Sequence, residues 1–314
     1  MTLPTINDVQ VVDPIQTNML VGYMQADNRF VADRVFPSVK VEKDSGTYYI
    51  FTKKYWFVDE MEERAPGQPF ARATFGVSSA TFKTLQWALD HALPDEVRAN
   101  SQVPMSLEEA GLRLLAQRAL IRKERLFSTD FMKGSVWGTT NTTATDWDDF
   151  SAGDPVKDII EAVRVISLNT GQTANSIVLG HIVHNALVNH PDLLDRLKYT
   201  QTIGLSTVEA ALADIFGLSN YWVGRASYNT ANEAATFSAS AIIDDDALVC
   251  YVTPNPGIFN ATAGMTFSWP GGGGDGIVSS YRDQARKSDI QQFQMQWDQK
   301  ATATDVGYIF TDIV

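Results

Sequence analysis

Ser176-Ile177-Val178-Leu179-Gly180 is a short apolar run that predicts a buried strand, and Tyr221-Trp222-Val223-Gly224-Arg225 predicts a second one. Between them, residues 184–191, 193–199 and 207–216 have the composition of helices. The order strand, helix, helix, helix, strand predicts a small α/β unit over residues 175–229. This unit contains no recognisable catalytic group, so the rest of the chain has to indicate the function.

The composition describes a globular, acidic chain. Its 314 residues are 44% hydrophobic and 20% charged, which allows two domains or one core with long extensions. The net charge is −12, and no Lys/Arg-rich tract offsets it, so sequence-specific binding to nucleic acid is not expected. Cys250 is the only cysteine, which excludes an intrachain disulfide framework. The N-terminus lacks the pattern of a signal peptide, and no apolar run is long enough to span a membrane, so a cytoplasmic origin fits best.

A long β-hairpin is predicted in the first third of the chain. Residues 47–57 are rich in aromatic strand formers, and residues 72–85 form a second strand-like run. The segment between them is acidic at 59–63 and is broken by prolines and a glycine. Because an isolated hairpin is only marginally stable in water, this one is expected to lean on something else. Its acidic tip is either a solvated loop or a docking patch for a basic surface of another subunit.

The remaining segments give an α+β prediction. Residues 1–40 lack helical periodicity and are expected to form an extended arm that buries little surface. A capping box at Ser106–Glu109 predicts a helix to about residue 133, roughly 40 Å long, with Leu114 and Ile121 facing the core. A polar loop is predicted at 135–153 and a helix from Asp154-Pro155 to Gly171. A second capping box at Ser206–Glu209 predicts another helix start, and strands are predicted at 237–252 and 258–269. Alternating residues around 293–297 predict a half-buried strand, and residues 306–310 are expected to pair with it.

Four features could carry chemistry, and each has a simpler interpretation. His181, His184 and His190 lack a further zinc ligand at suitable spacing and are interpreted as helix-surface histidines. The four glycines 271–274 lack the Gly-Lys-Ser/Thr ending of a phosphate loop, and the three aspartates 244–246 precede an apolar strand, so both are interpreted as turns. Cys250 has no histidine close to it in sequence. No catalytic residue, metal site or cofactor is therefore predicted.

The order of the elements and four sequence segments resemble the tailed-phage major capsid protein, the Hong Kong ninety-seven type of capsid fold. The segments are Asn189–Thr200 (NHPDLLDRLKYT), Leu212–Leu218 (LADIFGL), Val223–Asn229 (VGRASYN) and Ser280–Ser288 (SYRDQARKS). The resemblance covers nearly the whole chain. It implies five parts: an N-terminal arm at 1–40, an extended β-hairpin loop at 41–88, a peripheral domain with a spine helix at 89–174, an axial domain at 175–268, and C-terminal strands at 269–314 that return to the peripheral domain.

The resemblance also implies a function and partners. The protein would be a non-enzymatic shell protein that self-assembles through hexamers and pentamers, encloses double-stranded DNA without reading its sequence, and resides in the virion after assembly in the host cytoplasm. Family members with a built-in scaffold carry extra helical residues before the arm, so a separate scaffolding protein is expected here, with a portal and a possible decoration protein; an already processed form is the alternative. Subunit contacts are expected at the hairpin, through Tyr55, Trp56, Glu60, Glu62, Glu63, Arg64 and Arg72. The alternatives are an encapsulin-like shell of a bacterial compartment and an oligomeric enzyme with an unrecognised site.

Overall fold

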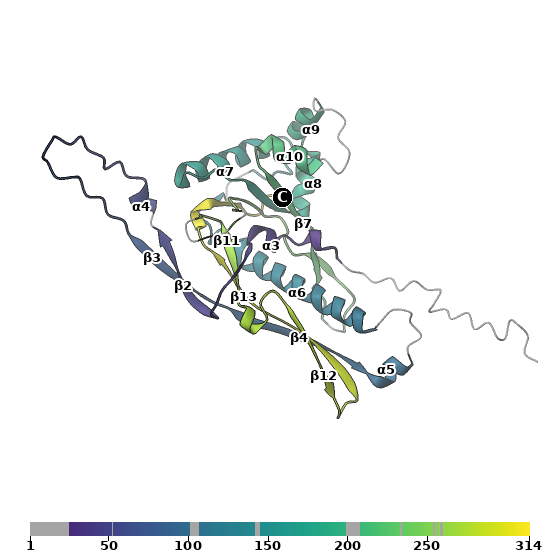
Figure 1. Ribbon diagram of the computed structural model, residues 1–314. Helices are drawn as coiled ribbons and strands as arrows, with labels where there is room; N and C mark the ends of the chain where they lie inside the picture. The colour runs from purple at the N-terminus through teal and green to yellow at the C-terminus, as the bar shows by residue number, and fades with distance from the viewer. Residues whose placement is uncertain are drawn as a thin grey trace, which may run out of the picture.

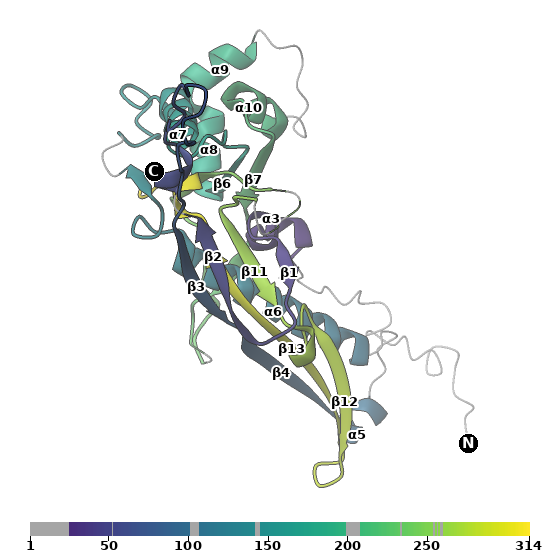
Figure 2. The same cartoon turned by 60° about the vertical axis from the view of Figure 1, so that its left-hand side comes forward.

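The structure is a computed structural model that describes residues 25–51, 53–100, 107–141, 145–198, 208–232, 234–253, 255, 257 and 260–314. It has the predicted α+β architecture, with a compact sheet at one end and a long sheet at the other (Figures 1 and 2). Several of the expected features lie outside the described residues at least in part: the arm up to residue 24, the start of the strand at 258–269, and the capping boxes, whose serines are at positions 106 and 206. No helix in the described part of the chain is long and apolar enough to cross a lipid bilayer.

The compact sheet has five strands in the order β5-β14-β10-β6-β7. Their bounds are β5 (Thr139–Asn141), β6 (Ser176–Gly180), β7 (Asn220–Gly224), β10 (Ala247–Cys250) and β14 (Gly307–Phe310). β6 and β7 run parallel, as the α/β unit requires, whereas β10 is antiparallel to both of its neighbours. β6 is buried over its whole length because both faces of the sheet are covered, which explains its unbroken apolar run.

Helices cover one face of the compact sheet. They are α7 (Pro155–Thr170), α8 (His181–Asn189), α9 (Pro191–Lys198) and α10 (Val208–Phe216) (Figure 1). α7 confirms its sequence signals: the Asp154 carboxylate accepts a hydrogen bond from the backbone N–H of Lys157, and Gly171 ends the helix with a left-handed φ of 69°. Alternate strand residues, such as Ile177 and Val249, pack beneath these helices in one continuous apolar core.

The opposite face is covered by an N-terminal strap, which we define as residues 25–36. It contains a 3₁₀ turn η1 (Asp27–Arg29) and a short helix α3 (Ala32–Val35). Val31, Val35 and Phe36 are completely buried there, and the Phe36 ring lies edge-on to that of Phe127, with centroids 5.2 Å apart. This burial differs from the expectation of an arm that buries little surface. Periodicity missed it because the strap is too short to show a repeat.

The long sheet is built around the 14-residue strand β13 (Ser288–Ala301). β4 (Leu85–Pro94) pairs along one side of β13. On the other side, β11 (Gly264–Ser268) pairs with its last five residues and β12 (Ile277–Asp283) with its first seven. β1 (Ser38–Lys40) extends this sheet in parallel beside β11. The four glycines 271–274 lie between β11 and β12, within a tight turn that includes η3 (Pro270–Gly272), so their interpretation as a turn is confirmed.

The helix α6 (Leu107–Phe131) packs along the long sheet and confirms the predicted long helix, but only one of the two residues predicted to face the core does so. Leu114 is 40% exposed, whereas its neighbour Leu115 is 2% exposed. Ile121 is partly buried against a small cluster with Phe30. Apolar residues occur on several sides of this helix, so periodicity alone did not fix which side faces the sheet.

The hairpin of β2 (Ser45–Phe51) and β3 (Val77–Lys83) projects away from the body (Figure 1). Its strands are shorter than predicted, because residues 53–56 form the helical turn α4 (Lys53–Trp56) and residues 57–76 form an irregular loop. Its base rests on the long sheet, where the Phe82 ring stacks on that of Phe267 with centroids 4.3 Å apart.

Other predictions of local structure need correction. Residues 306–310 do not pair back on 293–297: β14 lies between β5 and β10, in the compact sheet. The 135–153 segment is not simply a polar loop, since it contains β5 and two buried tryptophans, Trp137 and Trp147. The remaining small elements are α5 (Asp95–Ala99), β8 (Ser227–Asn229), β9 (Ala239–Ala241) and η4 (Thr304–Val306).

Candidate subunit-contact surfaces

Two of the three histidines that were considered as possible metal ligands are buried. His184 and His190 are 8% and 1% exposed, so their interpretation as helix-surface histidines is wrong. The His184 Nδ1 atom lies 3.0 Å from the Tyr221 hydroxyl, and burial lowers the pKa of His184. Among the described residues, no group of three or more His, Cys, Asp or Glu side chains is arranged to hold a metal ion.

Cys250 and the aspartates 244–246 contribute to the fold rather than to a binding site: the cysteine is buried, and Asp246 makes a hydrogen bond to the backbone. Cys250 is fully buried in β10, and burial raises the pKa of its thiol to about 12, so it is not a reactive nucleophile. Asp246 accepts a hydrogen bond from the backbone N–H of Asp312 at 3.3 Å, and burial raises its pKa to about 6. These contacts fasten the turn before β10 to the segment after β14.

The seven predicted contact residues lie together on the projecting hairpin. Tyr55 and Trp56 belong to α4, Glu60, Glu62, Glu63 and Arg64 to the irregular loop, and Arg72 to its return. All seven are exposed. We call residues 57–76 the hairpin loop.

Contacts within the hairpin loop and at its root define its shape. The Tyr55 ring lies over Gly76, where an added Cβ would be 2.7 Å from it, so the two ends of the loop meet. The Arg64 guanidinium lies 4.3 Å from the centre of the Phe70 ring. At the root, Lys53 Nζ pairs with an Asp305 carboxylate oxygen at 2.9 Å, which joins the hairpin to the body.

The hairpin loop presents an unusual amount of apolar surface. Four large apolar side chains on it are more than 60% exposed: Phe57 at 63%, Met61 at 95%, Phe70 at 80% and Phe75 at 66%. Monomeric proteins rarely expose contiguous apolar patches beyond a few hundred Å². The loop therefore has the composition of a surface that is covered in an assembly.

A second exposed surface lies at the far end of the long sheet. β12 is exposed along almost its whole length, with Ile277 at 46%, Val278 at 52% and Tyr281 at 49%. Only β13 pairs with it among the strands of the described residues. An exposed strand edge of this kind can accept a further chain.

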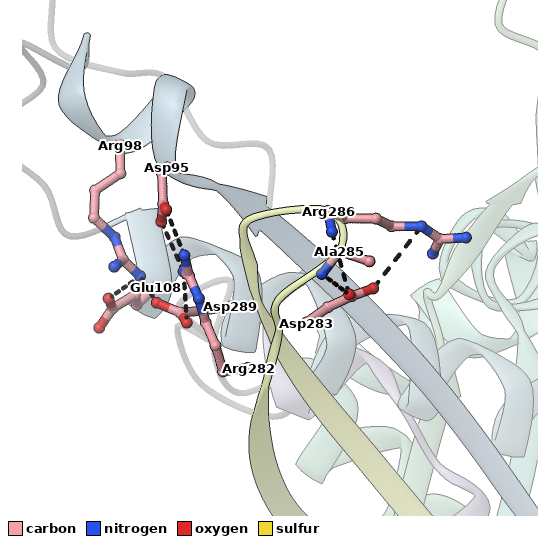
Figure 3. A network of polar contacts seen from close by, with 8 residues as sticks. All are labelled: Asp95, Arg98, Glu108, Arg282, Asp283, Ala285, Arg286 and Asp289. Carbon is pink, nitrogen blue, oxygen red and sulfur yellow. Dashed lines mark hydrogen bonds and ion pairs between the residues drawn. The ribbon is translucent and has the colours of Figure 1, made fainter.

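Ion pairs hold the β12–β13 hairpin against the helices at this end (Figure 3). Arg282 donates to the carboxylates of Asp95 in α5 and Asp289 in β13, the latter at 3.0 Å. Arg98 bridges Glu108 at 2.8 Å and Asp289 at 2.7 Å, which adds the start of α6 to the network. Hydrogen bonds from Arg282 lower the pKa of Asp95 and of Asp289.

The turn of this hairpin is fixed by Asp283, whose carboxylate accepts the backbone N–H groups of Ala285 and Arg286 at 2.9 and 3.2 Å (Figure 3). Sequence reasoning did not assign a role to these residues. The signal was present, because Arg282 and Asp283 belong to the segment SYRDQARKS that carried part of the family resemblance.

Comparisons with known proteins found a relative in sequence and several solved structures with a similar fold. No family model matches the chain. The chain is 25% identical over 226 residues to the major capsid protein of Burkholderia phage BcepMu, an alignment that covers 71% of this chain and 72% of the relative. A crystal structure of a phage-related protein from Bordetella bronchiseptica superposes with a TM-score of 0.70 at 20% identity, covering 93% of this chain and 94% of that one. The capsid of cyanophage P-SCSP1u gives a TM-score of 0.62 at 10% identity, covering 95% and 93%.

Proposed function

We propose that this chain, a structural capsid protein of a tailed phage, self-assembles into the icosahedral shell that encloses the double-stranded DNA genome of that phage. The observation that carries the proposal is the sequence relationship to a phage major capsid protein, over most of both chains, in a protein with the fold of phage capsids. The role is structural rather than enzymatic. The protein is a component of the virion.

The exposure of the hairpin loop supports a role as the segment by which one subunit contacts the next. Tyr55, Trp56 and the apolar side chains beside them would be covered by a neighbour, and the charges of Glu60, Glu62, Glu63, Arg64 and Arg72 would set the register of the contact. Complementary charge at an interface contributes more to specificity and association rate than to affinity. The ion pair between Lys53 and Asp305 would hold the root of the hairpin to its own subunit.

We assign the parts of the fold to the roles that the family resemblance implies. The five-part division, from the arm at 1–40 to the returning strands at 269–314, stays a proposal, as does the Hong Kong ninety-seven type of the fold. Hexamers and pentamers would be the building units. A separate scaffolding protein, a portal and a possible decoration protein would act with this chain during assembly in the host cytoplasm. The net charge of −12 is compatible with a shell that encloses DNA without binding it tightly.

Electron microscopy of the expressed protein tests this function. The protein is expressed alone and with the products of the neighbouring genes, and purified particles are imaged and treated with nuclease. Closed shells or ring-shaped capsomers are the expected result. A monodisperse monomer at micromolar concentration under both conditions would contradict self-assembly, and shells that package a cargo enzyme would favour a cellular compartment instead.

A further inference from the structure

An apolar pocket of about 190 Å³ opens between α6 and the long sheet. Its lining comes from three separate segments, β4, α6 and β13, and includes Trp87, Leu115, Arg118, Ala119, Arg122 and Met295. An apolar cavity of about 150 Å³ takes up a molecule of benzene, so this pocket has room for one apolar side chain.

The pocket is flanked by positive charge. Arg118 and Arg122 are exposed and lie one helical turn apart. The Arg122 guanidinium lies 4.4 Å from the centre of the Trp87 ring, which holds it at the pocket. No carboxylate of the described residues forms an ion pair with either arginine. A fitting occupant therefore combines one apolar side chain with flanking carboxylates.

The hairpin loop offers that combination. Met61 is 95% exposed, which makes it the most exposed large apolar side chain among the described residues. Four carboxylates surround it in sequence: Asp59, Glu60, Glu62 and Glu63. Two of these carboxylates precede Met61 and two follow it, so negative charge lies on both sides of it in the sequence. The hairpin carries this segment away from the body, so the pocket of the same chain is not its target (Figure 1).

We propose that Met61 of one subunit inserts into the pocket between α6 and β4 of a neighbouring copy, where the carboxylates around it pair with Arg118 and Arg122. This inference rests on the proposed function and names its contact. The apolar insertion excludes water, and the ion pairs fix the direction of approach. Burial of Met61 also removes an exposed apolar side chain from every subunit of the shell.

Cysteine cross-linking tests the contact directly. Met61→Cys is combined with Ala119→Cys, particles are assembled and oxidised, and subunits are separated on a non-reducing gel. Cys250 is fully buried, so it leaves the result unaffected. Covalent dimers and higher multiples are expected. Phe70→Cys with Ala119→Cys is the matched control, since Phe70 is 80% exposed on the same loop, and it should cross-link at least tenfold less.

Charge reversal provides the second measurement. Arg118→Glu with Arg122→Glu should lower particle yield at least tenfold, and so should Glu60→Lys with Glu62→Lys and Glu63→Lys. All five changes together should restore yield substantially. Arg125→Glu is the matched control: Arg125 lies on the same helix and also stacks on an aromatic ring, that of Tyr228 at 4.2 Å, but does not line the pocket. Circular dichroism confirms that each variant is folded.

Each outcome separates this inference from the proposed function. Shells of wild-type protein together with no cross-link between positions 61 and 119, or no rescue by the combined reversal, would overturn the contact and leave the shell function standing. A wild-type chain that never assembles would overturn both.

Discussion

The backbone N–H of Ala32 in the strap donates a hydrogen bond to Oε2 of Glu124 in α6 at 2.9 Å, across 92 positions of sequence. The N–H of Val31 lies 3.1 Å from both oxygens of the same carboxylate. Glu124 thus caps α3 from another helix, at 1% exposure. Burial raises its pKa to about 7; Asp33 adds to the rise, whereas the two N–H groups and Arg34 oppose it.

The first prediction concerns pH. The pKa of Glu124 is about 7 in the folded chain and about 4.5 in the unfolded chain, so the folded state holds the proton more tightly. Its contribution to stability is complete below pH 4.5 and is lost as pH rises through 7. Two and a half pKa units correspond to about 3 kcal/mol. Glu124→Gln cannot ionise, so the variant should lose about 3 kcal/mol less than wild type between pH 4.5 and pH 8.

Urea denaturation of unassembled protein at several pH values measures this difference. Asp246, with a pKa raised to about 6, contributes in the same direction to both proteins and cancels in the comparison. An identical pH dependence in wild type and variant would show that Glu124 does not titrate in this range.

The second prediction concerns α6. Leu115→Asp places a carboxylate at a site that is 2% exposed, without a partner, and should cost at least about 4 kcal/mol, enough to prevent folding. Leu114→Asp is the matched control, because Leu114 is 40% exposed and the change should be tolerated. Soluble expression and circular dichroism measure the difference. Equal behaviour of the two variants would mean that the face of α6 is misassigned.

The third prediction concerns a close approach of backbone. A Cβ added to Gly180, at the end of β6, would overlap the carbonyl oxygen of Asp244. Gly180→Ala should therefore cost about 3 kcal/mol, because the obstacle is backbone and cannot rotate away. Gly217 has a φ of 68° and open space around it, so Gly217→Ala should cost only about 1 kcal/mol. Thermal denaturation compares the two, and a Gly180→Ala variant as stable as Gly217→Ala would count against so close a contact between β6 and residue 244.

The fourth prediction concerns the hairpin loop. Reversing Glu60, Glu62 and Glu63 to Lys should leave folding intact, since all three are exposed, and should impair assembly. One exposed ion pair contributes about 1 kcal/mol or less, but a shell repeats the contact at every subunit. Light scattering of assembly at several salt concentrations measures the effect. A normal yield with unchanged salt dependence would mean that the loop is merely solvated.

Helices and strands that are specified by neighbouring residues in the sequence could be predicted. The helices of the α/β unit and α7 carry their own apolar patterns and terminating glycines, and these elements are confirmed. Non-local choices were missed: β14 pairs in the compact sheet rather than with β13, because strand partners are selected by tertiary packing. The burial of His184, in contact with Tyr221, depends on such packing as well.

The candidate contact surfaces also include one part that the sequence could predict and one part that it could not. Seven hairpin residues could be singled out because they lie within 18 positions of one another and carry aromatic or charged side chains. The pocket could not be found, since its lining comes from segments around residues 88, 118 and 294, which only the fold brings together. Whether the hairpin residues contact a neighbour stays a prediction.

The position of β14 also governs when the chain can fold during synthesis. This strand lies inside the compact sheet, between β5 and β10, and its residue Ile309 packs in the same apolar cluster as Val31 of the strap. Neither the sheet nor that cluster can close until residue 310 has left the ribosome. Contacts between such distant positions slow folding, because a long loop must be ordered first. Nascent chains therefore stay open to chaperones and to one another until residue 310 has left the ribosome.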